Sequence, residues 1–175
     1  MTFRARKAAD EASLYDYALS ALGRKMRSVA ELKRLLRVRV AAGEAGEAMV
    51  EAVVARLKEH GYLNDTAYAA ACSTYRKENE KFGRRRVITD LKARGVHRDV
   101  IDKAVADTYS GTNEEQLARA FLRRKNLKKP ASQKEAARIF RALVRAGFGS
   151  GTAVRVLKKW RVEEELLTAL EAEQD

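Results

Sequence analysis

The sequence contains few of the residues that interrupt or cross-link a chain. Its 175 residues include one proline, one cysteine and ten glycines. A single cysteine excludes an intrachain disulfide, which fits a reducing compartment. No apolar run approaches the length that spans a bilayer, and no apolar core follows the basic first residues as it would in a signal peptide. We therefore expect a cytoplasmic protein without a membrane partner.

Groups that perform chemistry are also scarce. His60 and His97 are the only histidines, and no His, Cys and carboxylate cluster has metal-ligand spacing. Residues 147–151 are glycine-rich but lack the preceding strand and the Gly-Lys-Ser/Thr ending of a phosphate loop. Cys72 lies on the apolar stripe of a helix, which is typical of a buried thiol. We expect no enzymatic activity, no cofactor and no metal site.

Helix-forming residues and positive charge dominate what is present. Ala, Leu, Arg, Lys and Glu are abundant, and no alternating polar and apolar run indicates a strand, so the fold class is all-α. The formal net charge is +12. Such an excess favours a polyanionic partner, nucleic acid first and an acidic protein surface second. A solvated surface without such a partner is the alternative.

Caps and apolar stripes divide the chain into successive groups of helices. Ser13 is a candidate N-cap, and Ser28 with Glu31 has capping-box spacing. Ser132 with Glu135 repeats that spacing. We expect helices over about 13–23, from Ser28, over about 47–60, from Asn64 or Asp65, from Arg84, over about 98–109, in three further segments up to Trp160, and in an acidic closing segment.

A repeat emerges when these groups are aligned. The apolar pairs Leu32/Leu36, Val87/Leu91 and Ile139/Leu143 recur at intervals of about fifty residues. Glycine follows two of the pairs, at Gly95 and Gly147, as a residue suited to a helix end. The repeat predicts an elongated array of three tandem three-helix modules. The modules are assigned to residues 13–63, 64–110 and 111–161, between a mobile basic arm (1–12) and an acidic C-terminal helix (162–175).

Several of these segments resemble one protein family. Residues 57–65 read Leu-Lys-Glu-His-Gly-Tyr-Leu-Asn-Asp, residues 81–87 read Lys-Phe-Gly-Arg-Arg-Arg-Val, and residues 91–96 read Leu-Lys-Ala-Arg-Gly-Val. With Ser28-Val-Ala-Glu-Leu32, they resemble the RecX regulatory proteins, bacterial modulators of the RecA recombinase. The resemblance covers roughly residues 14–160. One departure is Arg84, where the family usually has a proline that would fix the first helical turn.

The resemblance implies a non-enzymatic regulator. Members of the family are curved helical-repeat proteins that lie in the groove of the recombinase filament on DNA, where they hinder strand exchange and ATP turnover. The implied partners are the RecA filament, single-stranded DNA and, as a further option, double-stranded DNA, and the chain is expected to be a monomer. An extended array could touch several filament subunits, which raises avidity through effective concentration.

Basic clusters are the candidate contacts with DNA or a partner. One surrounds the start of the second helix of module two, one follows the first helix of module three in a mobile junction, and one flanks Trp160. Solvated surface cations are the alternative, and core packing is the favoured role of Phe82 and Trp160. The candidate residues are Lys81, Arg84, Arg85, Arg86, Arg94, Arg123, Arg124, Lys125, Lys128, Lys129, Lys158, Lys159 and Arg161.

Two other functional classes remain open from the residues alone. Each module has two short helices around a turn, as in a helix-turn-helix transcription factor or nucleoid protein, and Arg84–Arg86 could enter a groove. Against this, no recognition helix with polar residues for base edges is evident. A scaffold that contacts only proteins is the third reading, and it would keep its function after loss of the basic clusters.

Overall fold

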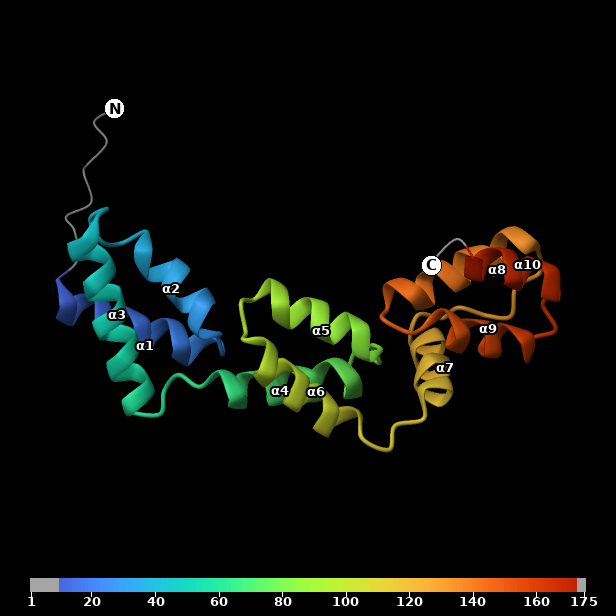
Figure 1. The fold of residues 1–175 in the computed structure, drawn as a ribbon, viewed down its shortest axis with the longest axis horizontal. Coiled ribbons are helices and arrows are strands. Elements are labelled where there is room, and N and C mark those ends of the chain that lie inside the picture. Colours follow the sequence, from blue (N-terminus) through green and yellow to red (C-terminus); the bar gives the residue numbers. More distant parts are fainter. Residues whose placement is uncertain (1–9, 173–175) are drawn as a thin grey trace, which may run out of the picture. The chain divides into compact units, whose positions relative to one another are not determined.

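The structure, a computed structural model, describes residues 10–172. Every regular element in this range is an α-helix, which confirms the predicted fold class (Figure 1). The elements are α1 (Glu11–Arg24), α2 (Val29–Arg37), α3 (Glu44–Glu59), α4 (Asp65–Glu78), α5 (Arg84–Ala93), α6 (Arg98–Tyr109), α7 (Glu114–Arg124), α8 (Gln133–Arg145), α9 (Ser150–Lys158) and α10 (Glu164–Ala172). Most of the predicted basic arm, residues 1–9, lies outside the described residues, as do residues 173–175 of the predicted acidic helix. None of the helices in residues 10–172 is both long and apolar enough to cross a bilayer.

Side-chain caps start several helices where the sequence predicted them. The Ser28 side chain accepts a hydrogen bond from the Glu31 amide at 3.1 Å, and the Glu31 carboxylate accepts one from the Ser28 amide at 3.1 Å. This completes the predicted capping box at the start of α2. At α8, Ser132 Oγ accepts from the Glu135 amide at 3.3 Å.

Two helices begin earlier than predicted. The Asp10 side chain caps α1 by accepting from the Ser13 amide at 2.8 Å, so the helix begins at Glu11 and the expected cap at Ser13 is wrong. A carboxylate three residues before an amide satisfies the helix end as well as a serine does. The third helix begins at Glu44 rather than near Glu47, because Gly43, with φ 117°, provides the change of direction.

An N-terminal compact unit comprises the described residues up to Ala69 together with Lys92–Val100. Helices α1, α2 and α3 pack on one another within it. Leu32 and Leu36, the first predicted apolar pair, are fully buried and face α1 and α3. Burial of a leucine side chain contributes about 1.5–3 kcal/mol, so this pair is a main source of cohesion. The core of the unit consists of Leu14, Tyr15, Ala18, Leu32, Leu36, Val50, Val53, Val54, Leu57 and Leu63.

A C-terminal compact unit comprises Ala70–Leu91 together with the described residues from Ile101 onward. Helix α9 packs against α7, α8 and α10. The other two predicted pairs, Val87/Leu91 and Ile139/Leu143, are buried. All three copies of the helical repeat therefore use the same positions for the core. The boundary between the compact units falls inside the predicted second module, and the three module boundaries stay a prediction.

Candidate partner-binding surface

Helix α5 presents a basic first turn to solvent. Val87 and Leu91 are fully buried, whereas Arg84, Arg85 and Arg86 are all exposed. No acidic residue lies in that first turn. Cations at the positive end of a helix dipole are unfavourable by about 0.3–1 kcal/mol each. A run of residues that weakens its own helix is a feature expected of a binding site rather than of a stabilising surface.

A close contact between two glycines holds the start of α5 in place. The Gly83 amide donates to the Ala146 carbonyl at 2.8 Å, and the Arg85 amide donates to the Gly147 carbonyl at 3.2 Å. A Cβ atom at Gly83 would collide with the Gly147 backbone, and one at Gly147, where φ is 92°, would collide with the backbone of Arg86. The turn after α8 therefore fixes where the α5 arginines lie.

Phe82 packs beneath this basic turn. Its ring centre lies 6.2 Å from that of Phe121, and the side chain is half-buried against the core of the C-terminal unit. The Tyr109 hydroxyl donates to the Phe82 carbonyl at 2.8 Å. Burial raises the pKa of Tyr109 well above its ordinary value, so the hydroxyl keeps its proton and this bond across the neutral range. The contacts agree with the predicted packing role of Phe82, and Trp160 is likewise half-buried against the same core.

The basic junction after α7 is a hydrogen-bonded turn up to Leu127. The Lys125 amide donates to the Phe121 carbonyl, and the Leu127 amide donates to the Leu122 carbonyl at 2.9 Å. Asn126 adopts a left-handed conformation with φ 52°. Leu127 packs on the core, whereas the neighbouring cations Arg123, Lys125, Lys128 and Lys129 are exposed. The junction was predicted to be mobile, but its first half is anchored at a defined place.

The fold brings together basic residues that are distant in sequence. A hollow of about 270 Å³ is lined by Arg123 of the junction and by Lys159 and Trp160 after α9. A second hollow, of about 280 Å³, is lined by both Lys129 and Arg161. Two predicted clusters thus form one basic surface on the C-terminal unit. Sequence reasoning missed three arginines that line hollows on this surface, Arg119, Arg138 and Arg145. The i, i+7 spacing of Arg138 and Arg145 on α8 was a signal that could have found two of them.

Ion pairs separate the predicted cations into two groups. Several make pairs within the C-terminal unit: Lys81 with Glu78, Arg86 with Asp90, Arg124 with Glu80, Lys158 with Glu164 and Lys159 with Glu115. Within residues 10–172, no ion pair is made by Arg84, Arg85, Arg123, Lys125, Lys128, Lys129 or Arg161. The second group is exposed and keeps its charge available for a partner.

Glu115 shows how the paired cations act on the fold. Its carboxylate accepts from Lys159 Nζ at 2.7 Å and from Arg155 Nε at 3.0 Å, which ties α7 to the end of α9. The hydrogen bond from Lys159 is the main cause that holds the pKa of Glu115 below its usual range. Lys158 similarly lowers the pKa of Glu164 through a hydrogen bond. Lys158 and Lys159 therefore have structural partners, unlike the junction cations Lys125, Lys128 and Lys129.

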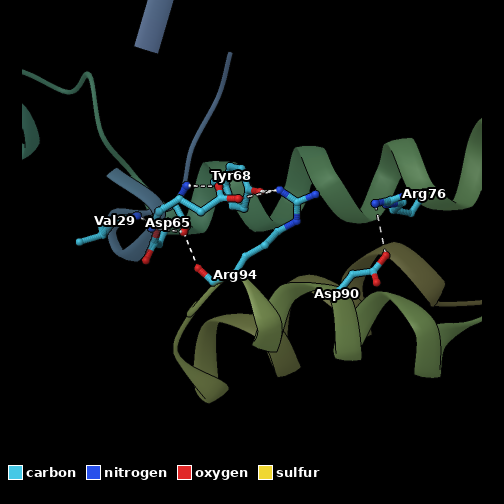
Figure 2. Close-up of polar contacts among 8 residues, drawn as sticks. Val29, Asp65, Tyr68, Arg76, Asp90 and Arg94 are labelled. Carbon is cyan, nitrogen blue, oxygen red and sulfur yellow. Dashed lines mark hydrogen bonds and ion pairs between the residues drawn. The ribbon is translucent and has the colours of Figure 1, made fainter. Parts of the chain in front are cut away.

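Arg94 is engaged inside the N-terminal unit. Its guanidinium donates to the Glu31 carboxylate at 2.9 Å and to the Tyr68 hydroxyl at 2.9 Å. Its carbonyl accepts from Ser28 Oγ at 2.6 Å. Figure 2 shows these contacts converging beside the bond from the Val29 amide to Asp65, which measures 2.8 Å. The Arg94 side chain is only 25% exposed. This residue, predicted to contact a partner, instead fastens the start of α2 to the segments around α4 and the end of α5.

A second polar cluster lies farther along α4 and α5. The Asp90 carboxylate, 14% exposed, pairs with Arg76 at 3.3 Å and with Arg86 at 3.1 Å (Figure 2 shows the Arg76 pair). Arg86 therefore shares an acidic partner with Arg76, whereas Arg84 and Arg85 do not. Among residues 10–172, no group of three His, Cys, Asp or Glu side chains is placed to hold a metal ion.

Together, the tandem helices and the exposed cations define an all-helical, strongly basic protein. A family model described as RecX, second three-helix domain, matches residues 64–105. Regulatory protein RecX of Myxococcus xanthus is 36% identical over 157 residues, which cover 82% of this chain and 83% of that protein. Regulatory protein RecX of Thermus thermophilus is 35% identical over 149 residues, covering 85% and 91%. The chain belongs to the RecX family of regulatory proteins.

Solved structures show the same fold. The crystal structure of RecX from Lactobacillus salivarius superimposes with a TM-score of 0.66 over 86% of this chain and 96% of that chain, at 16% identity. A further crystal structure of a regulatory protein RecX gives a TM-score of 0.65 over 85% of this chain. These likenesses support the helical-repeat architecture independently of sequence.

Proposed function

We propose that this protein regulates the RecA recombinase by binding the RecA filament on DNA, where it inhibits strand exchange and ATP turnover. Membership of the RecX family carries the proposal, because relatives with 35–36% identity align with most of the chain. Regulation of this kind requires binding without chemistry. The exposed cations of the C-terminal unit support it, since they are free to meet phosphates.

Within this proposal, the junction and the start of α5 supply the DNA contacts. Arg84, Arg85, Arg123, Lys128 and Lys129 are exposed and make no ion pair in the described part of the chain. Each cation that meets a phosphate releases counterions, which favours binding at low salt and weakens it as salt rises. Arg94, with its partners Glu31 and Tyr68, serves the fold instead.

The decisive experiment adds the protein in sub-stoichiometric amounts to the cognate RecA on single-stranded DNA. ATP turnover and filament length are followed together. We expect both to fall at ratios well below one protein per recombinase subunit, because a filament-bound regulator affects many subunits. Unchanged turnover and length at equimolar protein would overturn the proposal, and selective binding to one duplex sequence would favour a transcription factor.

A second measurement tests the DNA contacts. The triple variant R123Q/K128Q/K129Q should lower the salt slope of binding to a single-stranded oligonucleotide by about two units, since each lost phosphate contact contributes about 0.7. The control K58Q/K92Q/K103Q removes the same charge from exposed positions outside the basic surface. Equal slopes for the two variants would show that the junction cations are only solvated.

A further inference from the structure

A hollow of about 390 Å³ opens on the C-terminal unit between the start of α5 and the ends of α7 and α8. We call it the Phe82 hollow. Its apolar residues are buried or half-buried, and its three cations are exposed, so the cations form a rim around an apolar floor. No carboxylate, hydroxyl or amide side chain lines it. The lining residues are Phe82, Arg86, Phe121, Lys125, Leu127, Ala142, Arg145 and Ala146.

The floor of the Phe82 hollow is held rigidly. The Phe121 ring lies between those of Phe82 and Phe148, with its centre 6.2 Å from that of Phe82 at a tilt of 46° and 6.1 Å from that of Phe148 at 60°. The Tyr109 hydroxyl fixes the backbone of Phe82, and the Leu127 amide is bonded to Leu122. Such a preformed concave site loses little entropy when a ligand binds. The hollow is therefore suited to a side chain inserted from outside.

The polar side chains that line the Phe82 hollow are all hydrogen-bond donors. The rim offers the charged donors of Arg86, Lys125 and Arg145, and neither Lys125 nor Arg145 makes an ion pair within residues 10–172. Four backbone carbonyls of the lining already accept hydrogen bonds inside the chain: Phe82 from Tyr109, Phe121 from Lys125, Ala142 from Ala146, and Ala146 from Gly83. The ligand chemistry that matches this lining combines hydrogen-bond acceptors for the rim with an apolar body for the floor.

This chemistry discriminates between polyanions. Every nucleobase carries N–H donors, and a base inserted here would find no side-chain acceptor for them, which disfavours it. The rings of Phe82 and its neighbours offer limited stacking as well, since the guanidinium groups of Arg76 and Arg86 already lie 5.6 Å from the Phe82 ring centre. A peptide side chain such as leucine or phenylalanine has no donor, and flanking aspartates or glutamates supply acceptors for the rim.

We propose that the Phe82 hollow binds an acidic peptide segment of a partner protein. One large apolar side chain enters the hollow, and carboxylates on either side pair with Lys125, Arg145 and Arg86. The charge of the rim is complementary to such a segment, and the volume suits one side chain with its neighbours. This goes beyond the filament proposal, because it assigns a particular site to an acidic peptide segment and can be measured without recombinase or DNA.

The test compares two fluorescently labelled peptides by anisotropy with the full chain. Both are rich in aspartate, and they differ only in a central leucine or serine. We expect the leucine peptide to bind at least about tenfold more tightly, because burial of a leucine side chain corresponds to roughly a ten- to hundredfold difference. The variant K125Q/R145Q should weaken its binding about three- to tenfold.

Matched variants separate the hollow from general charge and from folding. R141Q/K134Q removes the same charge from exposed positions on α8 that do not line the hollow, and it should retain near-normal leucine-peptide affinity. A142F fills the hollow and should abolish the preference for leucine while leaving serine-peptide binding unchanged. Loss of fold, monitored by circular dichroism, would instead weaken both peptides.

Three outcomes would overturn the proposal. One is equal affinity for the leucine and serine peptides. Another is an equal effect of K125Q/R145Q and R141Q/K134Q. The third is that A142F weakens binding of an oligothymidylate but not of the leucine peptide, which would make the Phe82 hollow a nucleotide site. A leucine preference that depends on both the rim and Ala142 supports the assignment.

Discussion

Replacing Gly147 with alanine should loosen the attachment of α5 to the turn between α8 and α9. Gly147 has φ 92°, a conformation that side chains with a Cβ atom rarely adopt. The added Cβ would also meet the backbone of Arg86 and lie 2.8 Å from the Gly83 carbonyl oxygen. Because these neighbours are backbone atoms, the segments must move apart, and the bonds from Gly83 to Ala146 and from Arg85 to Gly147 are lost.

The expected cost follows from these two effects. Forcing alanine into the left-handed region costs about 1–2 kcal/mol. Each lost backbone hydrogen bond costs about 0.5–1.5 kcal/mol, so the free energy of unfolding should fall by about 2–5 kcal/mol. G111A is the matched control, since Gly111 has φ 64° and nothing lies within 4 Å of its added Cβ. G111A should lower the free energy of unfolding only by the cost of the left-handed backbone conformation, about 1–2 kcal/mol.

Urea unfolding of the full chain measures both variants. Trp160, the only tryptophan, reports on the C-terminal unit through its fluorescence, and circular dichroism reports on total helix. A midpoint shift at constant slope gives the change in stability. If G147A cost no more than G111A, the glycine contact would not be what holds α5, and the reasoning would be refuted.

Three further outcomes are expected. R84P should raise the midpoint of thermal unfolding by about 1–4 °C. Residue 84 is the first of α5, where proline removes no helical hydrogen bond and reduces the conformational freedom of the unfolded chain. A lowered midpoint would contradict this prediction. R94A should lower the free energy of unfolding by about 1.5–3 kcal/mol, because it removes the hydrogen bonds to Glu31 and Tyr68. A double-mutant cycle with E31Q should show a coupling energy above about 0.5 kcal/mol, and additive effects of the two substitutions would argue against the contact. The hydrogen bond from Lys159 lowers the pKa of Glu115 in the folded state. The stability that this carboxylate contributes is therefore complete above its ordinary pKa of 4.5 and is lost as the pH falls through the lowered pKa. E115Q should reduce the pH dependence of the urea midpoint across that acidic range, and a pH profile equal to that of the unmodified protein would exclude the effect.

Local patterns in the sequence predicted the features that depend on residues close together in the chain, namely buried apolar pairs and helix caps. The apolar pairs were recognisable because side chains one helical turn apart share a face, and all three pairs are buried. The capping box at Ser28 and Glu31 was recognisable because both of its bonds lie within four residues. The sequence analysis took Ser13 as the cap of the first helix and assigned Asp10 to the basic arm, whereas Asp10 is the residue that caps α1.

Contacts between distant residues could not be predicted in this way. Nothing near Gly83 indicates that it meets Gly147, because the close approach depends on two backbones separated by more than a module. The partners of Arg94 and the rim of the Phe82 hollow likewise come from separate helices. Whether a given arginine forms an ion pair depends on which carboxylate the fold brings within reach. The sequence gives the position of each arginine in the chain but not its distance from a carboxylate in the folded protein.

The sequence by itself determined the helical class, the repeat, the excess of positive charge and the family, because these follow from residue type and short-range periodicity. The tertiary structure alone decided which cations are neutralised, how the start of α5 is held and where an apolar hollow opens beneath a charged rim. The physical reason is range: helix periodicity and capping act within a turn or two, whereas burial, ion pairing and cavity shape depend on segments that meet only after the chain has folded.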